Sequence, residues 1–207
     1  MTASYRVPTR IETERLVLRT YVEADAEQLV EVVTRNLEHL RPYMEWIQFE
    51  PQTVADRREW IAGEAEKFAA GTGFTMGMFD ADGVLVGGSG FHVRSDPDGL
   101  EIGYWIDAAH EGKGLVTEAA AALTLVALDT AGAAVVTIGH APTNARSSAV
   151  PRRLGYRQRD LGGKQCFDAG EMAPAVEWVA DASTLTSEPL ASWPRPVVPA
   201  SPRPTSR

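Results

Sequence analysis

The sequence predicts a mixed α/β fold in which one sheet carries helices on both faces, and three observations support this. Segments with strand and helix patterns follow one another in the order β-α-α-β-β-β-α-β-α-β-β between residues 14 and 180. Asp- and Gly-rich turns at 80–83 and 96–99 join three successive strands, which favours antiparallel pairing. A continuous apolar run at 133–139 is typical of a buried, parallel central strand.

The N-terminal part is predicted to hold one strand and two helices. Residues 14–20 have the alternating apolar pattern of a strand. Asp25 is placed to cap a helix that continues to residue 36. Thr53, with Asp56 three residues later, matches the capping pattern of a second helix that continues to residue 70.

The segment 39–50 between those helices is aromatic-rich, lacks clean periodicity and is bounded by prolines. It predicts a short helix plus a loop, which either walls a pocket or covers the edge of the sheet. If it walls a pocket, the residues expected to contact a substrate are Tyr43, Glu45, Trp46 and Phe49.

The central part is predicted to contain strands at 73–79, 84–93 and 102–106, followed by a helix from Leu115 to about Ala131. A glycine run at 87–90 lies inside strand composition, and no helix follows it. We therefore expect a bulge or a close approach of another backbone there rather than a phosphate loop.

After the buried strand, Asn144 is placed to cap a short helix at 143–153, and a closing pair of strands is expected at 155–159 and 173–180. Residues 1–182 are thus expected to form one domain. Residues 183–207 are rich in Ser, Pro and Arg and poor in apolar side chains. This tail is expected to be disordered, or to be docked through Leu190 and Trp193 alone.

Composition excludes several classes of protein. The 207 residues carry a formal net charge of −8, which argues against nucleic-acid binding and suits a basic substrate such as an amine. The lone cysteine, Cys166, excludes an intramolecular disulfide framework and fits a reducing compartment. The first ten residues lack a signal-peptide pattern, and no apolar stretch is long enough to span a bilayer. We therefore expect a cytoplasmic protein with no membrane partner.

Metal binding is not expected either. The chain has four histidines, which show no metal-ligand spacing: His39, His92, His110 and His140.

The strongest local signal is a glycine turn between a strand and a helix, Gly112-Lys113-Gly114. It is not a Walker A loop, because Leu115 stands where Ser or Thr is needed. It is not a dinucleotide fingerprint, because Thr117 replaces the third glycine. The remaining interpretations are a short turn whose free amides face a diphosphate and a plain connection from strand to helix.

Four separated segments resemble the GNAT acyltransferases, and more narrowly the branch of ribosomal-protein N-terminal acetyltransferases. They are Ile-Gly-Tyr-Trp-Ile at 102–106, Gly-Lys-Gly-Leu-Val-Thr-Glu-Ala at 112–119, Asn-Ala-Arg-Ser at 144–147 and Leu-Gly-Tyr at 154–156. The first strand, 13–19, also resembles that branch. The resemblance covers about residues 11–180. It departs at Ala109, where many members have Gln or Arg, and at Pro151, where some carry a tyrosine acid.

The resemblance implies a mostly antiparallel sheet that opens in a V between two central parallel strands. It implies transfer of an acetyl group from acetyl-CoA to a primary amine, such as a protein N-terminus, by direct attack in a ternary complex. The residues expected to hold the acetyl-CoA co-substrate are Trp105, Ile106, Asp107, His110, Glu111, Gly112, Lys113, Gly114, Leu115, Val116, Thr117, Asn144 and Ser147.

The acetyl transfer itself needs a proton acceptor and groups that stabilise developing charge. Glu101, at the start of the strand beside the pantetheine arm, is the first candidate base, acting through a water, and Glu45 is the second. A backbone N–H near Trp105 could stabilise the oxyanion. Ser147 could donate to the leaving sulfur, as a serine does at the matching position in this branch. The alternatives are ordinary surface carboxylates and a local helix-start role for Ser147.

Three questions stay open at this point. A non-catalytic acyl-CoA-binding module is the main rival to an enzyme, and Pro151 in place of tyrosine favours it. The acceptor could also be a small-molecule amine such as an antibiotic or a metabolite, because no motif encodes its identity. A homodimer contact could be formed by the 39–50 segment or by the tail.

Overall fold

One eight-stranded sheet organises the chain. The computed structural model describes residues 5–95, 98–159 and 164–199. Its strands are β1 (Arg10–Glu12), β2 (Val17–Arg19), β3 (Gly73–Phe79), β4 (Leu85–Ser95), β5 (Asp98–Ile106), β6 (Val135–His140), β7 (Arg157–Arg159), β8 (Gln165–Asp168), β9 (Glu171–Pro174) and β10 (Val176–Asp181). Its α-helices are α1 (Ala26–Arg35), α2 (Leu37–Leu40), α3 (Val54–Ala70), α4 (Leu115–Asp129), α5 (Ala145–Arg153) and α6 (Ala182–Leu185). Short 3-10 turns are η1 (Glu23–Asp25), η2 (Glu45–Phe49), η3 (Ala108–His110) and η4 (Leu190–Ser192).

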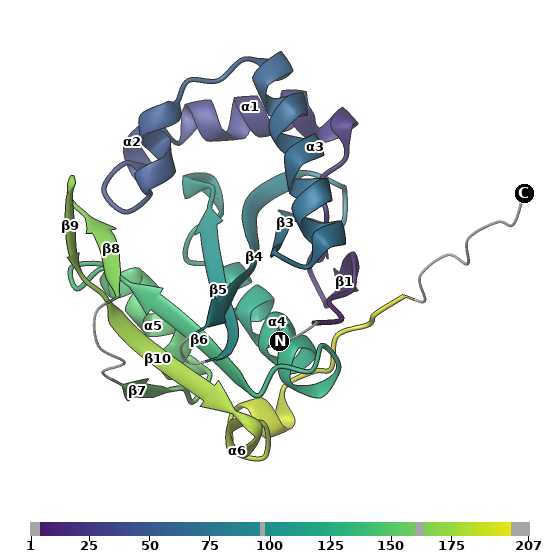
Figure 1. The fold of residues 1–207 in the computed structure, drawn as a ribbon, viewed down its shortest axis with the longest axis vertical. Coiled ribbons are helices and arrows are strands. Elements are labelled where there is room, and N and C mark those ends of the chain that lie inside the picture. The colour runs from purple at the N-terminus through teal and green to yellow at the C-terminus, as the bar shows by residue number, and fades with distance from the viewer. Residues whose placement is uncertain (1–4, 96–97, 160–163, 200–207) are drawn as a thin grey trace, which may run out of the picture.

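The sheet opens between its two central strands. The strand order is β1-β2-β3-β4-β5-β6-β10-β7, and β5 and β6 run parallel whereas the other described pairs are antiparallel. β5 and β6 pair only at Leu100–Val136 and Glu101–Thr137, although β5 continues to Ile106. Figure 1 shows the two strands diverging beyond that point. The predicted mixed, mostly antiparallel sheet with a V-shaped opening is confirmed.

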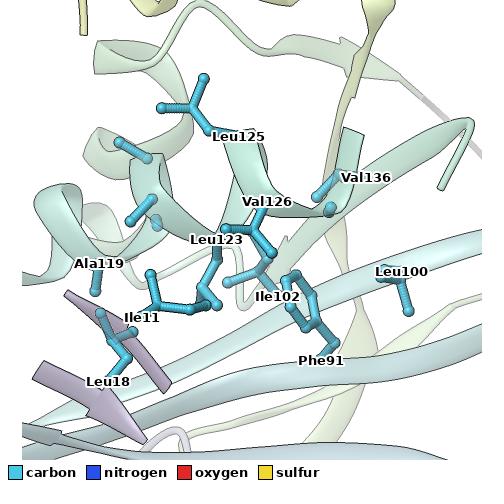
Figure 2. Packing of buried hydrophobic residues seen from close by; sticks show 14 of the residues in the cluster. Ile11, Leu18, Phe91, Leu100, Ile102, Ala119, Leu123, Leu125, Val126 and Val136 are labelled. Atoms are coloured by element: carbon cyan, nitrogen blue, oxygen red, sulfur yellow. The ribbon is translucent and has the colours of Figure 1, made fainter. Parts of the chain in front are cut away.

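Helices cover both faces of the sheet, each over its own apolar core. Helices α1 and α3 pack over one core, which includes Leu29, Ile61 and Phe79. The larger core lies under α4, which is buried along almost its whole length. Figure 2 shows Leu123 and Val126 of α4 extending toward Ile102 and Phe91 of the sheet, while Leu125 leaves the helix on its other side. These two layers hold the opening of the sheet between them.

The glycines of β4 allow the strands around the opening to pack closely. A Cβ on Gly90 would lie 2.1 Å from the Phe74 carbonyl oxygen, and one on Gly87 would lie 2.4 Å from the Trp105 carbonyl oxygen. Side chains at these positions would collide with backbone atoms, so glycine is required. The expected close approach of backbones at 87–90 is confirmed.

Local details of the predicted elements were right in some places and wrong in others. The Thr53 side chain accepts a hydrogen bond from Asp56 N (3.2 Å), as the capping pattern predicts. The Asp25 carboxylate does not cap α1, because it accepts instead from Val22 N (2.7 Å) and from both terminal nitrogens of Arg19. The strand β1 and the β8–β9 hairpin were not predicted, because each is short and carries little periodicity.

The C-terminal segment lies against the body of the protein as far as it is described. Leu190 is fully buried in the larger core, and Trp193 packs against it. Arg195 pairs with Asp129 at 2.5 Å, and Val197 exchanges two backbone hydrogen bonds of 2.8 Å with Glu12. The segment up to residue 199 thus has more contacts than the two expected at Leu190 and Trp193, and the division into a domain and a tail at residue 182 stays a prediction.

Two further predictions concern the turn at 96–99 and the absence of a membrane-spanning segment. The turn expected at 96–99 includes residues 96–97, which lie outside the described residues. None of the helices in the described ranges is both long and apolar enough to cross a membrane.

Candidate functional site

Two cavities meet at the opening between β5 and β6. The first has a volume of about 1020 Å³ and reaches from the glycine turn to α5. The second has a volume of about 880 Å³ and lies under the segment that follows α2. Both are lined by Tyr104 and Trp105 of β5 and by Asn144 and Ser147 at the start of α5. A molecule bound in one cavity can therefore reach a molecule bound in the other at this junction.

The glycine turn gives the first cavity free backbone donors. Gly112 and Gly114 have φ values of 71° and 79°, a left-handed conformation that favours glycine. The hydrogen-bonded ladder of α4 begins where Glu118 N donates to Gly114 O (3.0 Å), so the N–H groups of the first turn precede the ladder. They point out of the positive end of a helix dipole, which is the arrangement that binds a phosphate anion.

The lining of the first cavity is positively charged, although the chain as a whole has a negative net charge. Four cationic side chains line it, against the two acidic ones Glu111 and Glu118; the cationic residues are Arg15, Lys113, Arg146 and Arg153. Glu111 pairs with Arg146 at 2.9 Å, and Glu118 pairs with Arg15 at 2.6 Å. Neither Lys113 nor Arg153 has an ion pair among the described residues. The cavity therefore has a local positive potential suited to a polyphosphate such as coenzyme A.

Two residues near the N-terminus, Thr13 and Arg15, hold the glycine turn and the start of α4 in place. Arg15 donates to the Lys113 carbonyl oxygen (2.8 Å) and to Glu118 Oε2 (2.7 Å). Thr13 Oγ1 donates to Glu118 Oε1 (2.6 Å), so the start of the chain is tied to the first turn of α4. Arg15 was not among the predicted site residues, although the segment 13–19 carried part of the resemblance. Only the fold shows that this segment lies beside the turn.

The structure brings nearly all predicted acetyl-CoA residues to the first cavity. Twelve of the thirteen line it: Trp105, Ile106, His110, Glu111, Gly112, Lys113, Gly114, Leu115, Val116, Thr117, Asn144 and Ser147. Tyr104, Arg153 and the tail residue Trp193 also line it and were not predicted. Asp107 does not line the cavity, and its predicted role, in which the backbone at the end of β5 pairs with the pantetheine arm, stays a prediction.

Asp107 ties the end of β5 to the α1–α2 junction. Its carboxylate is 2% exposed and accepts from Arg35 (2.6 Å), from Asn36 Nδ2 (2.8 Å) and from Ala109 N (3.3 Å). Burial alone would raise the pKa of this carboxyl, but these hydrogen bonds hold it well below its usual range. The role that the structure supports for this side chain is to hold the base of the glycine turn in place.

Asp107→Ala is expected to destabilise the protein by roughly 2–3 kcal/mol, because it leaves Arg35 and Asn36 without their shared charged acceptor. A carboxyl whose pKa is depressed by folding contributes stability above its unfolded pKa of about 3.9, and that contribution is lost as the pH falls further. Urea unfolding should therefore show that the free energy of unfolding of wild type exceeds that of the variant by the full amount at pH 7. This difference should shrink below about pH 4. An unchanged difference at pH 3 would contradict the assigned contacts.

The junction of the cavities is organised by a pair of hydroxyl groups. Asn144 Oδ1 accepts from Ser147 N (3.0 Å), which confirms Asn144 as the cap of α5. The Tyr104 hydroxyl donates to the Ser147 carbonyl oxygen (3.2 Å) and lies 2.9 Å from Ser147 Oγ. Burial raises the pKa of Tyr104 to about 12, so its phenol keeps its proton at cellular pH.

The second cavity has the aromatic wall that the 39–50 segment suggested. Tyr43, Trp46 and Phe49 line it, and Trp46 packs edge-on against Trp105 with ring centroids 6.2 Å apart. Glu45 is exposed and does not line it. On the opposite side the β8–β9 hairpin closes the cavity, and Ala169 N at its tip donates to the Pro42 carbonyl oxygen (2.7 Å).

Glu101 also faces the second cavity, but its carboxylate is occupied. Oε2 accepts from Arg94 (2.9 Å), and Oε1 is paired with Lys164. Arg94 also donates to Glu177 on β10 (3.0 Å). Lys164 was not predicted to belong to the site, because nothing in its local sequence marks it, and it reaches Glu101 only through the fold.

The described residues were also compared with the arrangements that bind metal ions. Among the described residues, no group of three or more His, Cys, Asp or Glu side chains is arranged to hold a metal ion.

Sequence comparison identifies relatives along most of the chain. The acetyltransferase (GNAT) domain family matches residues 15–157. The "Putative ribosomal N-acetyltransferase YdaF" of Bacillus subtilis is 31% identical over 145 residues, which cover 69% of this chain and 78% of that protein. The [ribosomal protein uS5]-alanine N-acetyltransferase of Escherichia coli is 29% identical over 155 residues, 72% of this chain and 78% of that one.

Solved structures share the fold. The crystal structure of a probable acetyltransferase has a TM-score of 0.74 and 27% identity, over 83% of this chain and 95% of the other. RimL, a ribosomal L7/L12 α-N-protein acetyltransferase in complex with coenzyme A, has a TM-score of 0.71 at 20% identity, over 83% and 97%. The glycine turn, the opened pair of parallel strands and the sequence match agree, and the chain belongs to the GNAT family of acetyltransferases, which use acetyl-CoA to acetylate an amine.

Proposed function

We propose that this enzyme acetylates the α-amine at the N-terminus of a protein. The observation that carries the proposal is the second cavity, which adjoins the cavity proposed for acetyl-CoA at the junction formed by Tyr104 and Ser147. Its volume of about 880 Å³ lies in the upper part of the range of about 300–1,000 Å³ that drug-sized ligands occupy, so it exceeds what a small metabolite amine fills. The first residues of an extended peptide fit such a space. The relatives named as ribosomal-protein acetyltransferases support the same acceptor class.

In this proposal the first cavity holds acetyl-CoA. The amides of the glycine turn and of the first turn of α4 bind the diphosphate, and Lys113 adds charge at the mouth. The edge of β5 beyond Glu101 has no β6 partner, so its backbone groups are free to pair with the amides of the pantetheine arm. This places the thioester at the junction and leaves the second cavity for the amine.

Ser147 is proposed to stabilise the leaving sulfur. The Tyr104 hydroxyl can donate either to the Ser147 carbonyl oxygen or to Ser147 Oγ. When it donates to Oγ, the Ser147 proton is free to point at the sulfur as negative charge develops there. Backbone N–H groups of β5 near Trp105 serve the carbonyl oxygen. Transfer is direct and needs no covalent intermediate on the enzyme.

The acceptor class is tested with two peptides of one sequence that contains an internal lysine. One peptide has a free N-terminal Ala or Ser, and the other has the same residue already acetylated. Incubation with acetyl-CoA and mass spectrometry should show one acetyl group added to the free peptide, at the α-amine, and none added to the blocked peptide. Equal modification of the lysine in both peptides would assign the enzyme to side-chain amines. Turnover only with polyamines or aminoglycosides would replace the protein acceptor with a small molecule.

A further inference from the structure

A cluster of four charged side chains lies where β5 and β6 part. Glu101 forms the last rung between the two strands, and Arg94 of β4 bridges it to Glu177 of β10. Lys164, just before β8, completes the cluster by pairing with Glu101. A Cβ on Gly139 would lie 2.9 Å from Lys164 Nζ and 3.5 Å from Glu101 Oε1. The lysine head therefore lies against the β6 backbone beside the opening of the sheet, and a Cβ at Gly139 would displace it from its present position.

The position of Lys164 relates it to the reaction. Lys164, Glu101 and Gly139 line the second cavity together with Tyr104 and Ser147, which mark the junction with acetyl-CoA. The side chain of Lys164 is 22% exposed and that of Glu101 is 13% exposed. Both are thus shielded from bulk water and open to the cavity in which the amine is proposed to bind.

Its surroundings make the Lys164 ammonium lose its proton more readily than an ordinary lysine does. Burial and the nearby Arg94 lower the pKa of Lys164 to about 8, although Glu177 acts in the opposite direction. Cys166 and the Glu101 carboxylate, which pairs with the ammonium, also favour the charged form, and His92 lies nearby. A neutral form is accessible near physiological pH, which is the condition for a general base. Glu101 holds two cations and is poorly placed to accept a proton itself.

We infer that Lys164 is the proton acceptor for the attacking amine, and that Glu101 is a positioning residue that holds it at the opening of the sheet. The inference rests on the proposed function. Neutral Lys164 Nζ takes a proton from the acceptor ammonium, directly or through one water. The amine nitrogen then attacks the thioester carbonyl carbon, the N–C bond forms, the C–S bond breaks and the electron pair leaves on sulfur. The second amine proton is lost to solvent, the thiolate accepts a hydrogen bond from Ser147 Oγ and takes its proton from water, and Lys164 returns the proton it accepted to solvent.

Two substitutions separate this role from a structural one. Lys164→Arg keeps the positive charge and the pair with Glu101 but cannot give up its proton, because an arginine pKa exceeds 12. Lys164→Ala removes the group. Both variants are expected to lose roughly 10²–10⁴-fold in kcat with an amine acceptor, while the dissociation constant of acetyl-CoA stays at the wild-type value. Wild-type kcat in Lys164→Arg would overturn the inference, because charge alone would then suffice.

Chemical rescue of Lys164→Ala by added tertiary amines provides a second measurement. Tertiary amines accept protons but cannot be stably acetylated, so they can replace the missing base without acting as acceptors. They should restore turnover in Lys164→Ala, more strongly as their basicity rises, and should leave wild type unchanged. A defect in Lys164→Ala that no tertiary amine relieves would make the lysine structural. Failure of wild type on peptides would refute the proposed acceptor only, because the same ratios can be measured with any amine that wild type acetylates.

Discussion

Gly114→Trp is expected to abolish acetyl-CoA binding. Gly114 has a φ of 79° and lines the first cavity at the start of α4. A Cβ there would lie 3.6 Å from Arg15 Nη2, so the side chain would enter the space in which the diphosphate is proposed to bind. For wild type, acetyl-CoA at 100 times its dissociation constant adds about 2.7 kcal/mol of stability, a rise in Tm of roughly 5–10 °C. In the variant this rise should disappear, together with thiol release.

The matched control is Gly132→Trp. Gly132 has a φ of 87° and follows the far end of α4, and a Cβ at this position would have no heavy atom within 4 Å. The substitution therefore carries the same left-handed strain, about 1–2 kcal/mol, without touching the cavity. Its Tm should fall, but acetyl-CoA should still raise that Tm by the wild-type amount. If Gly114→Trp showed a wild-type shift, the glycine turn would not be the diphosphate site.

Local sequence was most informative where a conformation demands particular residue types. The two glycines of the turn indicated a left-handed backbone, and Asn144 indicated the start of α5. The mainly apolar run at 133–139 predicted β6, because a strand buried on both faces is composed mostly of apolar residues. Local sequence alone therefore marked the glycine turn and the start of α5, both of which line the first cavity.

The acceptor side could not be predicted in the same way, because its groups come together only through tertiary structure. Lys164 lies 63 positions from Glu101, and Tyr104 lies 43 positions from Ser147. A strand tyrosine and a loop lysine carry no local mark of their partners. The side chain of Asp107 has a role that local sequence did not predict, because Arg35 and Asn36, about 70 positions away, hold its carboxylate.

Ser147→Ala is expected to lower kcat by roughly 10²–10³-fold, the usual cost of removing one donor from a developing anion. The substitution leaves the fold of α5 intact, because Asn144 caps the helix through the Ser147 backbone N–H. The dissociation constant of acetyl-CoA should therefore stay near the wild-type value. The matched control is Ser148→Ala, since the neighbouring hydroxyl lines neither cavity and its removal should leave kcat unchanged. Equal loss in both variants would point to a disturbed helix.

Tyr104→Phe then tests whether the two hydroxyls act as a unit. The substitution keeps the ring that packs against the larger core and removes only the group 2.9 Å from Ser147 Oγ. In wild type it should lower kcat several-fold with little change in the acetyl-CoA dissociation constant, because the Ser147 proton is no longer directed toward the sulfur. In the Ser147→Ala background it should cost almost nothing, since the group it positions is already absent. Additive losses in the double variant would mean that Tyr104 acts on the reaction by a route that does not pass through Ser147.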